Sequence, residues 1–97
     1  MKVKETIQSY LVDNYPDEVE DILLADGLEE AFIGVTAGYG GITRACYDSS
    51  KCVEILMKRD GMDFGEAVEF FNFNIVGAYM GDYTPEFIFP FNKEMDS

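Results

Sequence analysis

The feature that most constrains the fold is a β-hairpin pattern at residues 31–47, which stands between two regions of helical spacing. An apolar run at 32–36 and another at 42–47 are separated by the glycine-rich stretch 38–41. Apolar runs joined by glycines are typical of two antiparallel strands with a tight turn. Because helical spacing flanks this hairpin on both sides, a mixed α and β domain is expected.

The N-terminal region predicts two helices, residues 3–13 and 16–25. Side chains at helical intervals mark the first helix: Val3, Ile7, Tyr10, Leu11 and Asn14. Pro16 is well tolerated in a first helical turn, and the acids that follow it suit the positive end of the helix dipole. Gly27 is expected to end the second helix.

Two further helices are predicted after the hairpin. Asp48 is a good N-cap for a helix that stops at Gly61. Asp63 and Glu66 have the spacing of a capping box, so the next helix begins near Phe64. This helix is predicted to be the central core element. Four apolar side chains form the face that is expected to be buried: Phe64, Val68, Phe71 and Ile75.

The last apolar run, residues 86–91, predicts a short edge strand, because Pro85 and Pro90 stand at its two ends. This strand is expected to pair with the hairpin and complete a small antiparallel sheet. The predicted fold is therefore one α+β domain over residues 1–97, with two N-terminal helices, a β-hairpin, two helices and a C-terminal strand.

The charge distribution carries the strongest functional signal. No positive side chain occurs between Lys4 and Arg44, and the chain has a net charge of −12. Eight acids lie close together in the first third of the sequence: Asp13, Asp17, Glu18, Glu20, Asp21, Asp26, Glu29 and Glu30. Such a field repels nucleic acid and membrane headgroups and attracts basic surfaces, so these eight residues are the predicted partner-binding site.

Several classes of chemistry are excluded by the residue types. The chain has no histidine, which removes the commonest general base and transition-metal ligand. Cys46 and Cys52 cannot complete a four-ligand zinc site and are expected to be reduced, partly buried thiols. The sixth position counted from Asp13 is Glu18 rather than the glycine of a calcium-binding loop. We therefore assign no catalytic residue, no metal site and no cofactor, and expect a protein that is not an enzyme.

No run of about 18 apolar residues is present, as a membrane-spanning helix would need. The N-terminus also lacks the apolar core of a signal peptide, so a cytoplasmic location is expected.

The segment from Tyr47-Asp48-Ser49-Ser50-Lys51-Cys52 through Glu66-Ala67-Val68-Glu69-Phe70-Phe71 to Thr84-Pro85 resembles a group of short proteins encoded by bacteriophages and by phage-like segments of bacterial genomes. No activity is assigned to that group. The resemblance covers about residues 47–85, so it implies an origin more than a function, and it provides no catalytic residues.

These observations predict a small phage-type accessory protein that binds a host or defence protein with a basic surface. It would act as an acidic mimic of nucleic acid and inhibit a nucleic-acid-binding complex, without itself binding nucleic acid or membrane. One alternative is a regulatory or dimerisation module that uses its aromatic C-terminal half and whose acidic face is only solvated surface. Another is a small enzyme or ligand-binding domain with buried carboxylates, because 19 acids can include a catalytic pair.

Overall fold

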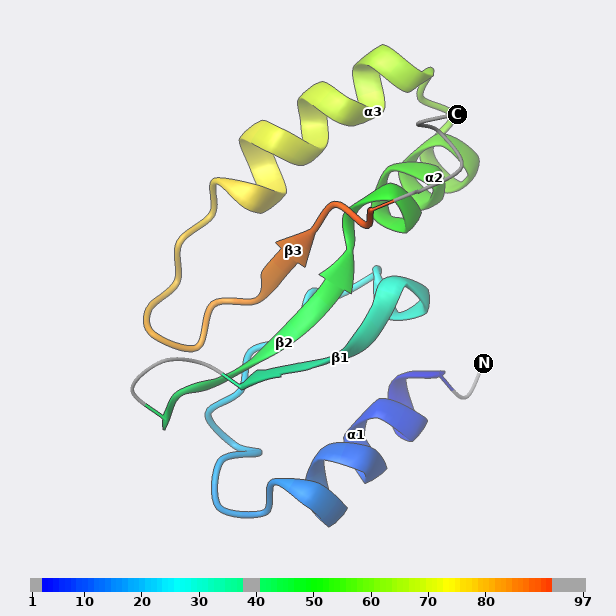
Figure 1. Ribbon diagram of the computed structural model, residues 1–97. Helices are drawn as coiled ribbons and strands as arrows, with labels where there is room; N and C mark the ends of the chain where they lie inside the picture. Colours follow the sequence, from blue (N-terminus) through cyan, green and yellow to red (C-terminus); the bar gives the residue numbers. More distant parts are fainter. Residues whose placement is uncertain (1–2, 38–40, 92–97) are drawn as a thin grey trace.

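The computed structural model describes residues 3–37 and 41–91 (Figure 1). In chain order the elements are α1 (Val3–Asn14), the 3₁₀ turn η1 (Glu29–Ala31), β1 (Phe32–Ala37), β2 (Thr43–Asp48), α2 (Ser49–Asp60), α3 (Phe64–Phe70), the π-helix η3 (Phe71–Val76) and β3 (Glu86–Ile88). The three strands within the described ranges form one mixed sheet, which confirms the α+β class. In Figure 1 the strands lie between α1 and the pair α2 and α3.

The predicted hairpin is confirmed. β1 pairs antiparallel with β2, and Val35 stands opposite Ala45 in the register. The register shifts between Phe32 and Gly34, where the chain has one irregular residue. Residues 38–40 of the predicted turn lie outside the described part of the chain.

The predicted antiparallel pairing of residues 86–91 is wrong. β3 covers only Glu86–Ile88 and pairs with β2 in the parallel direction, with Phe87 opposite Tyr47. The parallel direction arises because α2, α3 and η3 form a crossover connection that carries the chain back before it enters the sheet again. β3 does lie at an edge of the sheet, as expected for a strand that Pro85 directly precedes, because proline has no N–H to donate.

The first predicted helix is confirmed by α1, which buries Ile7 and Leu11. The second predicted helix, residues 16–25, is wrong, because residues 16–21 form turns and residues 22–25 have no regular secondary structure. One hydrogen bond of helical type, from Ile22 N to Glu18 O at 3.1 Å, closes a single turn.

The acid content of this segment explains why the turn does not extend into a helix. In a helix Asp17 would lie beside both Glu20 and Asp21, and like charges three and four residues apart repel each other. The apolar stripe that would have to offset this repulsion is narrow, since Ile22 is buried but Val19 and Leu23 are only partly covered. Neither the charge pattern nor the packing therefore favours a longer helix.

Both predicted helix caps are confirmed. The Asp48 carboxylate accepts hydrogen bonds from the backbone N–H groups of Ser50 at 2.9 Å and Lys51 at 3.2 Å. At the start of α3, Asp63 Oδ1 accepts from Glu66 N at 2.8 Å, and Glu66 Oε1 accepts from Asp63 N at 3.0 Å. These reciprocal bonds are the predicted capping box, and they satisfy N–H groups that the helix itself leaves unpaired.

The core is formed by residues from α1, the turns, the strands and the later helices: Ile7, Leu11, Ile22, Leu28, Ala31, Ala45, Tyr47, Cys52, Val53, Leu56, Ala67 and Phe71. Tyr47 of β2 is fully buried, and its hydroxyl accepts a hydrogen bond from Ala25 N at 2.8 Å. Its ring stacks on that of Phe87 at 5.6 Å between centroids. Tyr47 thus connects the sheet to the 22–28 segment.

The prediction that the Phe64 helix is the central core element is wrong. Phe71 is buried, whereas Val68 and Ile75 are half-buried and Phe64 is 65% exposed. Ala67 and Phe71 are the fully buried residues of the helical segment, and Val68 and Ile75 pack against the core while partly exposed. The α-helix also ends at Phe70, and the wider π-helix begins at Phe71. The spacing of 3.6 residues per turn therefore does not predict which side chains of the whole helical segment are buried.

Candidate functional site

The eight predicted binding residues fall into two groups in the structure. Five of them follow one another along the last turn of α1 and the turns after it: Asp13, Asp17, Glu18, Glu20 and Asp21. The other three lie between residues 26 and 30, close to the basic side chains of α1 and α2. We refer to the first group as the acidic end.

The acidic end carries uncompensated negative charge. Four of its five residues are exposed and Glu18 is half-buried. Within residues 3–37 and 41–91, no ion pair joins any of the five to a basic side chain. In Figure 1 this part of the chain, the C-terminal end of α1 and the loop after it, lies at the opposite end of the molecule from α2.

The position of Asp13 shows that this charge does not stabilise the fold. Asp13 lies in the last turn of α1, where the helix dipole is negative and where no basic residue is present. The acidic end is therefore a region where the local electrostatics oppose the folded structure.

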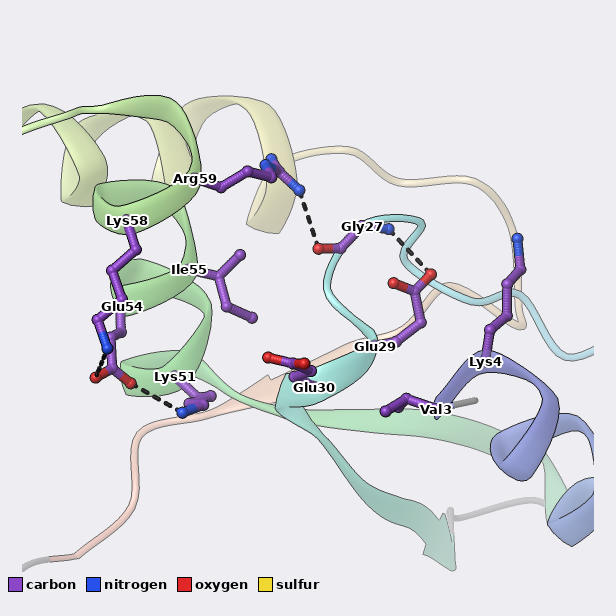
Figure 2. A pocket seen from close by; sticks show the side chains of 10 residues that line it. All are labelled: Val3, Lys4, Gly27, Glu29, Glu30, Lys51, Glu54, Ile55, Lys58 and Arg59. Carbon is purple, nitrogen blue, oxygen red and sulfur yellow. Dashed lines mark hydrogen bonds and ion pairs between the residues drawn. The ribbon is translucent and has the colours of Figure 1, made fainter. Parts of the chain in front are cut away.

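The remaining three predicted residues have local partners or line a cleft. Asp26 pairs with Lys4 at 3.5 Å, and both side chains are largely exposed. Glu29 accepts a hydrogen bond from Gly27 N at 3.0 Å. Glu30 is exposed and faces the cleft between η1 and α2 (Figure 2).

That cleft has a volume of about 500 Å³ and is lined by four basic side chains, although the protein as a whole is acidic. Its walls come from α1, the 27–30 segment and α2: Val3, Lys4, Gly27, Glu29, Glu30, Lys51, Glu54, Ile55, Lys58 and Arg59. Figure 2 shows the ion pairs that Glu54 forms with Lys51 and Lys58 along α2. The sequence analysis did not identify these basic residues as a group. Lys51, Glu54 and Lys58 nevertheless have the three- and four-residue spacing at which ion pairs form along a helix, so the two pairs of Glu54 could have been predicted.

The charges in this cleft neutralise one another. Glu54 contacts Lys51 at 3.1 Å and Lys58 at 3.2 Å, and these hydrogen bonds lower the pKa of its carboxyl group. Arg59 pairs with Asp60 at 2.9 Å, which lowers the pKa of Asp60 and raises that of Arg59. Because each of these cations has an acidic partner, and Glu29 and Glu30 also line the cleft, the cleft has no excess positive charge for an anion.

A second hollow bears on the ligand-binding alternative. It has a volume of about 520 Å³ and lies between the 23–28 segment, η3 and the approach to β3. Most of its walls are apolar, including Leu23, Ile75 and Phe87. The acid that lines it, Asp26, has a side chain that is 84% exposed, so this hollow does not supply the buried carboxylate that the alternative requires.

The two cysteines are free, as predicted, and both are buried. Burial raises the pKa of the Cys52 thiol to about 12 and also raises that of Cys46. Thiolates are the reactive form, so both side chains are inert packing groups at neutral pH.

The later helices carry exposed apolar side chains in the aromatic C-terminal half, which the dimerisation alternative took as the working surface. Large apolar side chains of α3, η3 and the segments that follow are exposed: Phe64, Phe70, Phe73, Val76, Tyr79, Met80, Ile88, Phe89 and Phe91. The signal was present, because these residues widen the apolar face of the predicted helix beyond one stripe. Of these residues, Phe70 and Phe73 lie together at one hollow, and clustered exposed apolar residues mark interaction surfaces in soluble proteins.

None of the helices in the described part of the chain has the length and apolar content needed to cross a membrane. In the same residues, no three His, Cys, Asp or Glu side chains gather so that they could hold a metal ion.

No protein-family model matches this chain, and neither does any curated protein or solved structure, so the functional argument rests on the geometry of its surfaces.

Proposed function

We propose that this protein is a non-enzymatic binding protein whose acidic end engages a basic surface of a partner protein. The observation that carries the proposal is the set of five acids from Asp13 to Asp21 that have no basic partner in the described residues. Their arrangement opposes stability, because Asp13 faces the negative end of a helix dipole and the acids after it repel each other. Positions where a sequence departs from local stability rules are often functional ones.

The placement of the charges supports an encounter with a basic partner. Lys4 and the cations of α2 each have an acidic partner among Glu54, Asp60 and Asp26, whereas the acids of the acidic end have no basic partner in the described residues. A protein with a net charge of −12 and an uncompensated end attracts positive surfaces over several ångströms and speeds their association. The best-known surfaces of that kind are grooves that bind the phosphates of DNA or RNA.

The partner that fits this chemistry is a nucleic-acid-binding protein of the host or of its defence systems, which the acidic end would occupy in place of nucleic acid. The resemblance of residues 47–85 to bacteriophage proteins is consistent with such a target. In this role the protein acts by exclusion and needs no cofactor.

An affinity pull-down from a bacterial host lysate, at low and at high salt, tests the proposal. The wild-type chain should retain a basic nucleic-acid-binding protein at low salt and lose it at high salt, because salt screens exposed charges. The double variant Asp17→Lys/Asp21→Lys should lose the partner at both salt concentrations. A matched control, Glu5→Lys/Asp82→Lys, makes the same change in net charge at two exposed acids outside the acidic end and should retain it.

Equal loss of the partner from both double variants would mean that only total charge matters, and retention by both would mean that the acidic end is solvated surface. Either result would overturn the proposal.

A further inference from the structure

A second surface of the molecule combines exposed aromatic rings with acids. Phe70 and Phe73 are 39% and 78% exposed, and they line a shallow hollow of about 540 Å³ together with Met62, Glu66, Glu69 and Asn74. We refer to it as the Phe70/Phe73 groove. It lies on α3 and η3, which run along the outer edge of the molecule in Figure 1.

The groove residues occupy one side of a continuous helical segment. Glu66, Phe70 and Phe73 are separated by four and three residues, and Glu69 is four residues before Phe73. The change from α-helix to π-helix after Phe70 occurs within this surface, and such π-helical segments are frequent at functional sites.

The charged residues that line the groove, Glu66 and Glu69, are both acidic. From Gly61 to Phe91 the chain contains no Lys or Arg but does contain Asp63, Glu66, Glu69, Asp82 and Glu86. Within the described residues, Glu69 has no basic partner, and Glu66 contacts the Asp63 backbone rather than a cation. A partner with basic side chains around an apolar stripe would satisfy both features of the surface.

A second copy of this chain fits the groove poorly. Two copies that met through this face would bring Glu66 and Glu69 of each against acids of the same sign, and each copy carries a net charge of −12. Charged groups of like sign across an interface cost several kcal/mol and exclude wrong partners. The aromatic surface is therefore unsuited to a homodimer despite its exposure.

We propose that the Phe70/Phe73 groove binds a basic amphipathic helix of a partner protein. The apolar face of that helix would pack on Phe70, Phe73 and Met62, and its Lys or Arg side chains would pair with Glu66 and Glu69. Exposed phenylalanines beside a flexible methionine are a surface that adapts to such a helix. This site is separate from the acidic end, because α3 and the end of α1 lie on opposite sides of the strands in Figure 1.

Binding of a synthetic peptide to the full-length protein tests this inference. The probe is a labelled amphipathic helix with leucines on one face and lysines on the other, measured by fluorescence anisotropy. Two control peptides are needed, a scrambled sequence of the same composition that forms no apolar face, and a version with glutamates in place of the lysines. We expect the wild-type protein to bind the probe at least about tenfold more tightly than either control peptide.

Variants locate the binding on the protein. Phe73→Ala removes an exposed ring, and Glu69→Lys reverses a charge outside the capping box, so both variants should fold like the wild type. Each should weaken probe binding at least about tenfold, as expected for an aromatic anchor and a complementary charge. Ile33→Ala, on the exposed surface of β1, and Asp17→Lys/Asp21→Lys, at the acidic end, should each leave probe affinity within about threefold.

The outcomes separate this inference from the proposed function. If Asp17→Lys/Asp21→Lys abolishes probe binding and Phe73→Ala does not, the groove is not the site and the acidic end is. If the scrambled peptide binds as tightly as the probe, recognition is by charge alone and the groove inference is wrong. A dimer in sedimentation velocity that Phe73→Ala dissociates, with no binding of the probe, would show that a second copy occupies the surface and would also overturn it.

Discussion

Arg59 Nη1 donates a hydrogen bond to the carbonyl oxygen of Gly27 at 3.0 Å, and so connects the last turn of α2 to the segment that enters η1 (Figure 2). The approach is close because residue 27 has no side chain. A Cβ at this position would lie 2.6 Å from Nη1, and the backbone φ of +87° is one that other residues rarely adopt. Gly27 was predicted to end a helix, but its role is to allow this contact.

Gly27→Ala should lower the free energy of unfolding by about 1–3 kcal/mol, because the left-handed backbone becomes strained and the Arg59 side chain must move. Urea denaturation measures this loss. Gly65→Ala is the matched control, since that glycine lies in the first turn of α3 with only an ordinary contact at 3.5 Å, and it should leave stability unchanged or raise it by about 0.5–1 kcal/mol. Equal effects at the two positions would show that the Gly27 backbone is unstrained.

Asp63→Ala should destabilise the protein by about 0.5–2 kcal/mol, because α3 loses the hydrogen bond that Glu66 N donates to the Asp63 carboxylate. Thermal denaturation measures the effect, and partner binding should be unchanged after correction for the folded fraction. Asp82→Ala, at an exposed acid in a turn, is the control and should change stability by no more than about 0.5 kcal/mol. A loss of binding at an unchanged melting temperature would instead make Asp63 a contact residue.

Phe71→Ala should cost about 3–5 kcal/mol, because the ring is 1% exposed and its removal leaves a cavity next to Phe87. Phe73→Ala, two residues further on, should cost less than about 0.5 kcal/mol, because that ring is 78% exposed. Chemical denaturation of both variants compares a buried with an exposed phenylalanine in the same helix. Similar losses for the two would mean that both rings are buried.

The acidic end should act mainly on the rate of association. Asp17→Lys/Asp21→Lys is expected to slow association with the basic partner and to change dissociation little, because long-range fields steer encounter whereas short contacts set dissociation. Raising the salt should have the same effect, since the Debye length falls from about 10 Å at 0.1 M to about 3 Å at 1 M. Surface-binding kinetics at two salt concentrations measure both rates, and an unchanged association rate would eliminate the acidic end as the working surface.

Stability should fall at alkaline pH. Burial raises the pKa of Cys52 from 9.0 to about 12 and that of Tyr47 from 10.0 to about 12, so the folded state holds both protons more tightly than the unfolded state. The stabilising contribution of each group is therefore complete below its unfolded pKa and is lost as the pH rises toward about 12. Denaturation midpoints measured from pH 8 upward should decline less steeply for Cys52→Ala than for the wild type, and parallel declines would show that ionisation of this thiol is not coupled to unfolding.

The candidate site was only partly predictable. Sequence reasoning placed eight acids on one surface, but the fold separates Asp26, Glu29 and Glu30 from the acidic end. These three residues lie near Lys4 and the cations of α2, which are up to about 30 positions away in the chain. A count of charge along the sequence cannot find such compensation, because it depends on which distant segments pack together.

The features that the sequence by itself determined are those whose physical causes lie within a few residues. The caps at Asp48 and Asp63 are satisfied by backbone groups two or three residues away, and the β1–β2 hairpin joins strands adjacent in the chain, so local chemistry was sufficient. The tertiary structure alone decided the parallel direction of β3 and the exposure of Phe64, which the sequence predicted to be buried together with Phe71. Strand direction depends on the path of a long crossover, and the buried side of a helix depends on where its apolar surface meets the core, so contacts between distant segments settle both.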